Sequence, residues 1–112
     1  MAKILVVEDE PDQLAVRRQL LEQAGYEVIS ARSAADALPQ LPNCQAVLMD
    51  LRIPKLDDGM ELIHAAKAAS APIIVLSGAE SDSALPVDQF VTKPCSSRKL
   101  LEIVMRVCGP PE

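Results

Sequence analysis

The stretch Lys3–Glu10, KILVVEDE, places four branched apolar residues directly before three acidic ones. A short apolar run of this kind is typical of a buried strand in a parallel sheet. Three more apolar runs also end in a polar residue suited to phosphate or a metal ion, at Asp50, Ser77 and Lys93. Because the carboxyl ends of parallel strands share one edge of a sheet, we expect these residues to meet there.

The rest of the chain alternates short apolar runs with longer segments of helical period. This alternation predicts βαβ units and an α/β fold built on a parallel sheet. Strands are expected over residues 3–7, 27–31, 46–51, 72–76 and 89–92. Helices are expected from about Pro11, after Ser33, over about 59–69 and from Ser96 or Ser97.

Spacing and special residues refine three of these segments. The apolar face of the first expected helix consists of Leu14, Val16, Leu20, Leu21 and Ala24, with Gly25 ending the helix. Pro39 interrupts the second helical segment, so that helix should be short or kinked. Residues 78–88 are too few and too polar for a full crossover helix, which predicts one turn at most or an irregular connection.

Composition restricts the class of protein. A chain of 112 residues suits one domain, expected over 1–108, with a short tail at 109–112. Only 2% of residues are aromatic and the net charge is −5, which argues against a nucleic-acid partner. No apolar run is long enough to span a membrane and no signal peptide is evident, so we expect a cytoplasmic protein with no membrane partner. The cysteines, Cys44, Cys95 and Cys108, are expected to be reduced thiols.

Three carboxylates at one edge predict a site for Mg²⁺ or another divalent cation, which prefers oxygen ligands. Asp9 and Asp50 could be direct ligands, and Glu8 could hold a metal-bound water. The metal would offset the mutual repulsion of the carboxylates, which otherwise raises the pKa of at least one of them.

The same edge suits phosphoryl transfer. Asp50 is the natural nucleophile, because a carboxylate can form an acyl phosphate. Lys93 could neutralise an incoming phosphoryl group or pair with Asp50 at rest, and Ser77 offers a hydroxyl. Backbone N–H groups near Arg52 and Gly78 could complete the phosphate cradle. Each motif alone has an ordinary structural explanation, but their ordered occurrence on four strands favours a functional site.

Five motifs together resemble the receiver domain of two-component response regulators, of the single-domain chemotaxis-regulator type. They are Lys3–Glu10 (KILVVEDE), Met49–Pro54 (MDLRIP), Gly59–Leu62 (GMEL), Ile74–Gly78 (IVLSG) and Phe90–Pro94 (FVTKP). The resemblance implies a flavodoxin-like (βα)₅ doubly wound sheet with strand order 2-1-3-4-5. It also implies phosphorylation of Asp50 by a phosphohistidine donor in a Mg²⁺-dependent reaction.

The resemblance assigns roles to individual residues. The implied metal site comprises Glu8, Asp9, Asp50 and the carbonyl of Arg52. The implied catalytic residues are Asp50, Ser77 and Lys93. Phe90 falls at the aromatic switch position of the family, and the Lys93–Pro94 peptide bond is expected to be cis.

Three features depart from the family pattern. The loop 54–59, after the phosphorylated strand, looks one residue longer than usual. Cys95 replaces the apolar aromatic residue that usually follows Lys-Pro. The fourth helix is expected to be reduced or absent. It normally contributes to the output and dimer face, so this departure concerns the readout more than the phosphoryl chemistry.

The leading hypothesis is therefore a phosphoacceptor response regulator that signals by protein–protein interaction, as a monomer or weak homodimer. Its partners would be a sensor histidine kinase or histidine phosphotransfer protein and a downstream protein target. It would catalyse only its own phosphorylation and slow autodephosphorylation, and is not otherwise an enzyme. Two alternatives stay open: a phosphorelay intermediate that passes phosphate to a histidine phosphotransfer protein, and an interaction module uncoupled from phosphorylation.

Overall fold

The computed structural model describes residues 2–78 and 86–111 and contains a five-stranded parallel sheet. The strands are β1 (Lys3–Val7), β2 (Glu27–Ala31), β3 (Ala46–Asp50), β4 (Ile73–Ser77) and β5 (Gln89–Thr92). The helices are α1 (Pro11–Gln23), α2 (Ala34–Ala37), the 3₁₀ helix η1 (Leu38–Asn43), α3 (Leu56–Ala68) and α4 (Ser97–Cys108). The order β2-β1-β3-β4-β5 confirms the predicted flavodoxin-like α/β topology.

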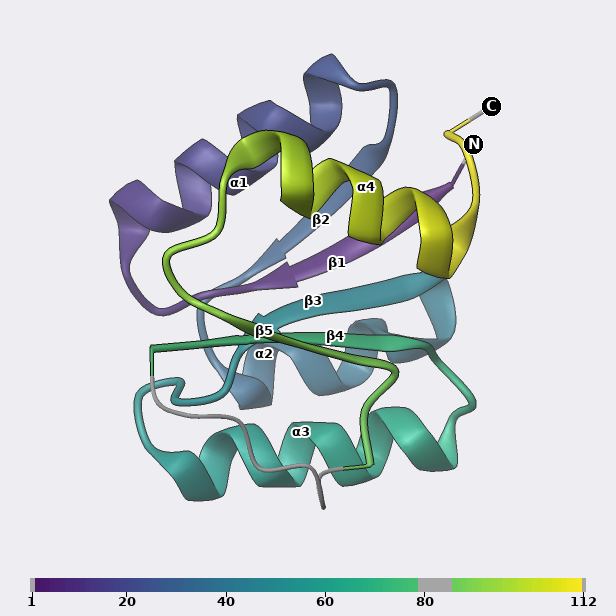
Figure 1. Cartoon of the computed structure of the whole chain (residues 1–112). Helices are drawn as coiled ribbons and strands as arrows, with labels where there is room; N and C mark the ends of the chain where they lie inside the picture. Colours follow the sequence, from purple (N-terminus) through teal and green to yellow (C-terminus); the bar gives the residue numbers. More distant parts are fainter. Residues whose placement is uncertain (1, 79–85, 112) are drawn as a thin grey trace.

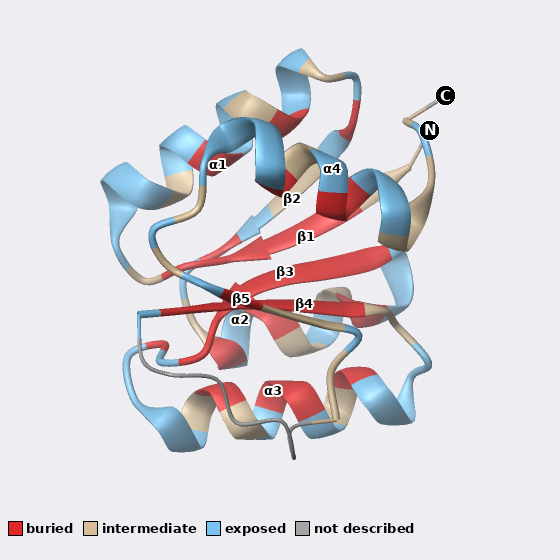
Figure 2. Ribbon diagram, in the orientation of Figure 1, coloured by how far each residue is buried: buried red, intermediate tan, exposed pale blue. Residues whose placement is uncertain are grey.

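Helices cover both faces of the sheet, with α1 and α4 on one face and α2 and α3 on the other (Figure 1). Successive residues of a strand point to opposite faces, so each strand supplies both layers. In β1, Leu5 and Val7 belong to the layer under α2 and α3, while Ile4 and Val6 belong to the layer under α1 and α4. The central strands are accordingly buried throughout, and the helices are exposed on their outer sides (Figure 2).

Two local predictions are confirmed in the second helical segment and at the end of the first helix. Ser33 Oγ accepts a hydrogen bond from the Asp36 backbone N–H at 3.1 Å and caps α2. The α-helix then gives way to η1, which contains Pro39, because proline cannot donate the hydrogen bond that an α-helix needs. Gly25 has a φ of 103°, as expected for a glycine after a helix end.

The predicted start of α3 was wrong by three residues. The helix begins at Leu56, and the Lys55 backbone N–H donates to Asp58 Oδ2 at 3.3 Å. Acidic residues stabilise a first helical turn, so Asp57 and Asp58 belong to the helix and not to a loop. Gly59 then has a packing role, because a Cβ there would lie 1.7 Å from the carbonyl oxygen of Leu51.

The predicted apolar face of α1 is also partly wrong. Val16 is 62% exposed, whereas the neighbouring Arg17 is 7% exposed. In α1, Leu14, Leu20 and Leu21 are buried or half-buried as predicted, and so is Ala24 directly after the helix, but Arg17 is buried in place of Val16. The buried stripe of this helix therefore includes a charged residue, which requires a partner.

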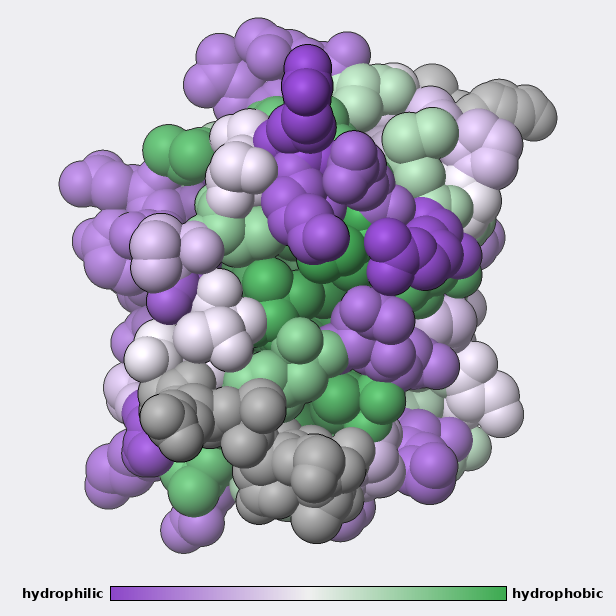
Figure 3. Space-filling model, in the orientation of Figure 1, coloured by the Kyte–Doolittle hydropathy of each residue, from purple (hydrophilic) through white to green (hydrophobic). Residues whose placement is uncertain are grey.

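Within the described residues, β5 pairs with β4 alone and forms one edge of the sheet. Hydrophobic residues gather over the middle of this side of the molecule, between α4 and α3 (Figure 3). The predicted reduction of the helix before β5 concerns mainly residues 79–85, which lie outside the described residues. Among the described helices, none is long and apolar enough to cross a membrane.

Candidate functional site

Hydrogen bonds beyond the strand ends hold the carboxyl edge of the sheet together. Glu8 N–H donates to Ala31 O at 3.0 Å, and Lys93 N–H donates to Ser77 O at 2.7 Å. A cavity of about 400 Å³ opens at this edge. Its lining includes every residue predicted for the site: Glu8, Asp9, Asp50, Arg52, Ser77 and Lys93.

Three carboxylates converge in this cavity. Glu8, Asp9 and Asp50 each offer an oxygen, and these oxygens all lie within 4.8 Å of one another. Glu8 follows β1 and Asp50 ends β3, and strand alternation directs both toward the layer of α1 and α4. Glu8 is 3% exposed and Asp50 is 6% exposed, so two of the three carboxylates are buried.

Lys93 supplies one positive charge to this group. Its Nζ lies 2.7 Å from Asp50 Oδ1, which confirms the pairing expected at rest. Asp50 Oδ1 is buried, so this contact with the Lys93 ammonium is shielded from water. The Lys93–Pro94 peptide bond is cis, as predicted, and the Ile53–Pro54 bond is cis as well.

The second positive charge is Arg17, which the sequence interpretation missed. Arg17 Nη1 donates to Glu8 Oε1 at 2.7 Å and to Asp50 Oδ2 at 3.3 Å. Glu8 Oε2 accepts from the Glu10 N–H at 3.1 Å, so both oxygens of Glu8 are engaged. The signal that could have found Arg17 is its position three residues after Leu14, inside the buried stripe of α1 and on the face to which Glu8 points.

Burial and mutual repulsion give the two buried carboxylates different pKa values. Burial raises the pKa of Glu8 to about 7, and the adjacent Asp50 adds to this rise, while the Glu10 N–H and Arg17 oppose it. Burial also acts to raise the pKa of Asp50, but Glu8, Lys93 and Arg17 together outweigh it. The pKa of Asp50 is therefore lowered from its ordinary value, and Asp50 is a carboxylate at neutral pH.

The donor set fits a hard divalent cation. Three carboxylate oxygens lie close together, and an ion such as Mg²⁺ binds through one or two carboxylates while it keeps several waters. Arg52 is exposed at the rim of the same cavity.

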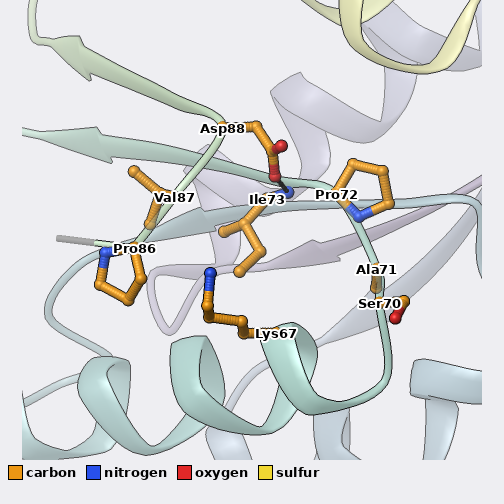
Figure 4. A pocket seen from close by; sticks show the side chains of 8 residues that line it. All are labelled: Lys67, Ser70, Ala71, Pro72, Ile73, Pro86, Val87 and Asp88. Atoms are coloured by element: carbon orange, nitrogen blue, oxygen red, sulfur yellow. Dashed lines mark hydrogen bonds between the residues drawn. The ribbon is translucent and has the colours of Figure 1, made fainter.

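A cavity of about 330 Å³ lies at the opposite, amino-terminal edge, between α3 and the starts of β4 and β5 (Figure 4). There the Asp88 side chain accepts a hydrogen bond from the Ile73 N–H at 2.7 Å. Lys67 also lines this cavity. Among the described residues, the cluster of three acidic groups suited to a metal ion is found at the carboxyl edge alone.

Comparison with known proteins agrees with this arrangement. Residues 4–105 match the family model described as the response regulator receiver domain. The chain is 33% identical to the sensor protein GacS of Pseudomonas syringae pv. syringae, over 96% of this chain and 13% of GacS. It is 37% identical to the probable transcriptional regulator ycf27 of Cyanophora paradoxa, over 88% of this chain and 44% of that protein.

The crystal structure of a response regulator receiver protein from Sinorhizobium medicae superposes with a TM-score of 0.86. That protein is 26% identical, and the match covers 99% of this chain and 97% of the other. By contrast, the chain spans less than half the length of the two curated relatives above. With the acidic pocket of Glu8, Asp9 and Asp50 in place, the chain belongs to the receiver domain family of two-component response regulators.

Proposed function

We propose that this receiver domain accepts a phosphoryl group on Asp50 from a phosphohistidine donor and signals through a downstream protein. The donor would be a sensor histidine kinase or a histidine phosphotransfer protein. The observation that carries the proposal is the environment of Asp50. This buried, ionised carboxylate lies 2.7 Å from the Lys93 ammonium, in a cavity lined by the other residues predicted for phosphoryl transfer.

The chemistry follows from these groups. An oxygen of the Asp50 carboxylate attacks the donor phosphorus, and a P–O bond forms as the P–N bond breaks. The histidine nitrogen leaves with the electron pair and takes up a proton. Asp50 needs no general base because its lowered pKa keeps it ionised. Lys93 neutralises charge on the phosphoryl oxygens, and the Ser77 hydroxyl donates to one of them.

Mg²⁺ or another divalent cation would be held by Glu8, Asp9, Asp50 and the carbonyl oxygen of Arg52. When bound, the ion supplies positive charge against the charge that the phosphoryl oxygens carry in a loose, in-line transition state. The chain's own contribution is to hold the carboxylates together at the strand ends, with Glu8 and Asp50 largely buried from bulk solvent.

Intact-protein mass spectrometry after incubation with acetyl phosphate and Mg²⁺ tests the proposal. The wild-type chain should gain one phosphoryl group, and Asp50→Ala should gain none. Asp57→Ala is the matched control, because Asp57 is an exposed aspartate on α3, and it should behave as wild type. Equal labelling of Asp50→Ala and wild type would exclude Asp50 as the acceptor.

The similarity to a receiver-sized part of the sensor protein GacS favours a second candidate, a phosphorelay intermediate. In that case the phosphorylated chain would pass its phosphoryl group to a histidine phosphotransfer protein. Mixing the labelled chain with candidate phosphotransfer domains distinguishes the two functions. Rapid transfer of label to one domain supports the intermediate, whereas retention of label on this chain supports output by protein binding.

A further inference from the structure

Arg17 occupies a position where a charge is hard to accommodate. It lies on α1 between Leu14 and Leu21, which pack in the apolar layer shared with α4. Only 7% of Arg17 is exposed. A guanidinium group stays protonated at any physiological pH, so its charge has to be matched by neighbours. The matching groups are Glu8 and Asp50, two of the three carboxylates that suit a metal ion.

One nitrogen makes both contacts. Arg17 Nη1 lies 2.7 Å from Glu8 Oε1 and 3.3 Å from Asp50 Oδ2, so it bridges the two carboxylates. A divalent cation that binds Glu8 and Asp50 needs oxygens on the same two side chains. Two cations that share these oxygens at such distances repel each other strongly in a buried site. Occupation by the metal therefore requires Arg17 to loosen its contacts or to leave.

The structure offers room for that movement. A cavity of about 430 Å³ lies between α1 and α4, and Arg17 forms part of its wall. Gln13, Leu76 and Lys93 line both this cavity and the acidic one, so the two spaces adjoin. Gln13 Oε1 also accepts a hydrogen bond from Arg17 Nη2 at 3.4 Å. The guanidinium could thus turn away from the carboxylates without opening the helix layer.

We propose that Arg17 is an internal counter-cation that competes with a divalent cation for Glu8 and Asp50 and so lowers the metal affinity of the site. This inference rests on the proposed function, because it concerns the metal that the phosphoryl transfer would use. Arg17 acts here as a positioning residue. In the metal-free domain it holds the two carboxylates together, and its contacts with them must loosen or break when the metal binds.

Isothermal titration calorimetry with Mg²⁺ at pH 8, without any phosphoryl donor, tests the inference. Arg17→Leu, which continues the apolar stripe of α1, should bind Mg²⁺ about tenfold to a hundredfold more tightly than wild type, the usual range of coupling between two binding events. Arg17→Lys keeps the charge and should bind more weakly than Arg17→Leu. Equal or weaker binding by Arg17→Leu would overturn the inference.

Arg18→Leu is the matched control. Arg18 is the next residue on the same helix, its side chain is 51% exposed, and it pairs with Glu22 at 3.1 Å. Its replacement removes the same charge from the chain without touching Glu8 or Asp50. This variant should retain the wild-type affinity. A gain equal to that of Arg17→Leu would mean that net charge, and not the bridge, controls binding, and would also overturn the inference.

A measurement on the wild-type chain covers the case in which Arg17→Leu does not fold. The side-chain N–H resonances of Arg17, assigned by NMR, should shift or broaden as Mg²⁺ saturates the site, while those of Arg18 stay in place. Unchanged Arg17 resonances at saturation would contradict the competition. Both experiments measure metal binding without phosphorylation, so their results stand even if Asp50 does not accept phosphate. Equally, a failure of the competition between Arg17 and Mg²⁺ would leave the labelling of Asp50 unaffected.

Discussion

The two edges of the sheet handle polar groups in opposite ways. At the carboxyl edge, Glu8, Arg17, Asp50 and Ser77 are the polar or charged residues that are buried in the described part of the chain. At the amino edge, the ion pair between Lys3 and Glu27 spans 3.6 Å, and its side chains are 42% and 48% exposed. The carboxyl edge therefore contains a group of buried charges, whereas the charges of this ion pair at the amino edge are in contact with water.

This difference has an energetic meaning. Burial of a charge is unfavourable, and even a well-paired buried ion pair often adds no net stability compared with apolar residues. Exposed ion pairs contribute little in either direction. The carboxyl edge is therefore expected to be the part of the molecule where function is maintained at the expense of stability. Four substitutions, from the largest expected effect to the smallest, examine that contrast.

Gly59→Ala should have the largest effect on stability, because the new Cβ would lie 1.7 Å from the carbonyl oxygen of Leu51. Leu51 is the residue that follows Asp50 in the chain. We expect a loss of about 3 kcal/mol or more in the free energy of unfolding, measured by urea denaturation. Gly78→Ala is the control at the same edge, since a Cβ there meets nothing within 4 Å. A loss below about 1 kcal/mol for Gly59→Ala would mean that α3 can move away from Leu51 at little cost.

Glu8→Gln should change how stability depends on pH in the presence of a chelator. Folding raises the pKa of Glu8 from 4.5 to about 7, so the folded state holds this proton more tightly. The stability that this proton contributes is present below about pH 4.5 and is lost as the pH rises through about 7. Wild type should thus lose about 2 kcal/mol relative to Glu8→Gln between pH 5 and pH 8.

Urea denaturation at a series of pH values measures this difference. Titration of Asp50 does not interfere with this measurement, because its pKa is lowered from the ordinary value of 3.8. The stability that the ionised Asp50 contributes is present above pH 3.8 and is lost as the pH falls through the lowered pKa. Parallel pH profiles for wild type and Glu8→Gln would show that the proton on Glu8 is not linked to folding.

Tyr26→Phe should have a moderate effect at the amino edge. The Tyr26 hydroxyl donates a hydrogen bond to Gly109 O at 2.7 Å, and Tyr26 is 3% exposed. Loss of one buried hydrogen bond of this kind should lower the free energy of unfolding by about 1 kcal/mol. The effect should be independent of Mg²⁺, and a Mg²⁺-dependent loss would show that the two edges are coupled.

Lys3→Ala should have the smallest effect. Its ion pair with Glu27 is half-exposed, and such pairs contribute about 0.5 kcal/mol or less. The midpoint of urea denaturation should stay close to that of wild type at both low and high salt. If Lys3→Ala lowered the free energy of unfolding more than Tyr26→Phe does, the exposed ion pair would matter more than expected. The proposed difference between the two edges would then be contradicted.

Most of the fold could be predicted from the sequence, because strand and helix periods are local properties. The range of β1 and that of β5 agree with prediction, and the strand order followed from the family resemblance. The start of α3 was misplaced because an acidic pair before a glycine suits either a loop or a first helical turn. The contact between Gly59 and Leu51 O, which requires that glycine, depends on tertiary packing that spacing alone does not reveal.

The candidate site could be predicted to a similar extent. Its acidic residues and Lys93 follow apolar strands, and the topology brings them together. Arg17 escaped prediction because two faces of this helix carry apolar residues. One face includes Val16, and the other, which carries Leu14 and Leu21, also includes Arg17. The choice between them is decided by the buried carboxylates of Glu8 and Asp50, which make the position of Arg17 favourable for a cation.

The arrangement of the chain ends has a practical consequence. The Ala2 N–H donates to Pro111 O at 3.4 Å, and both ends lie on the same side of the molecule (Figure 1). The hydrogen bond from the Tyr26 hydroxyl to Gly109 O holds the C-terminal tail at the amino edge of the sheet. Asp50 lies at the opposite, carboxyl edge. A fluorescent protein or affinity tag fused to either end would therefore leave the acidic cavity open to a donor. Two reporters, one on each end, would start close together, and their energy transfer would respond to unfolding of the tail.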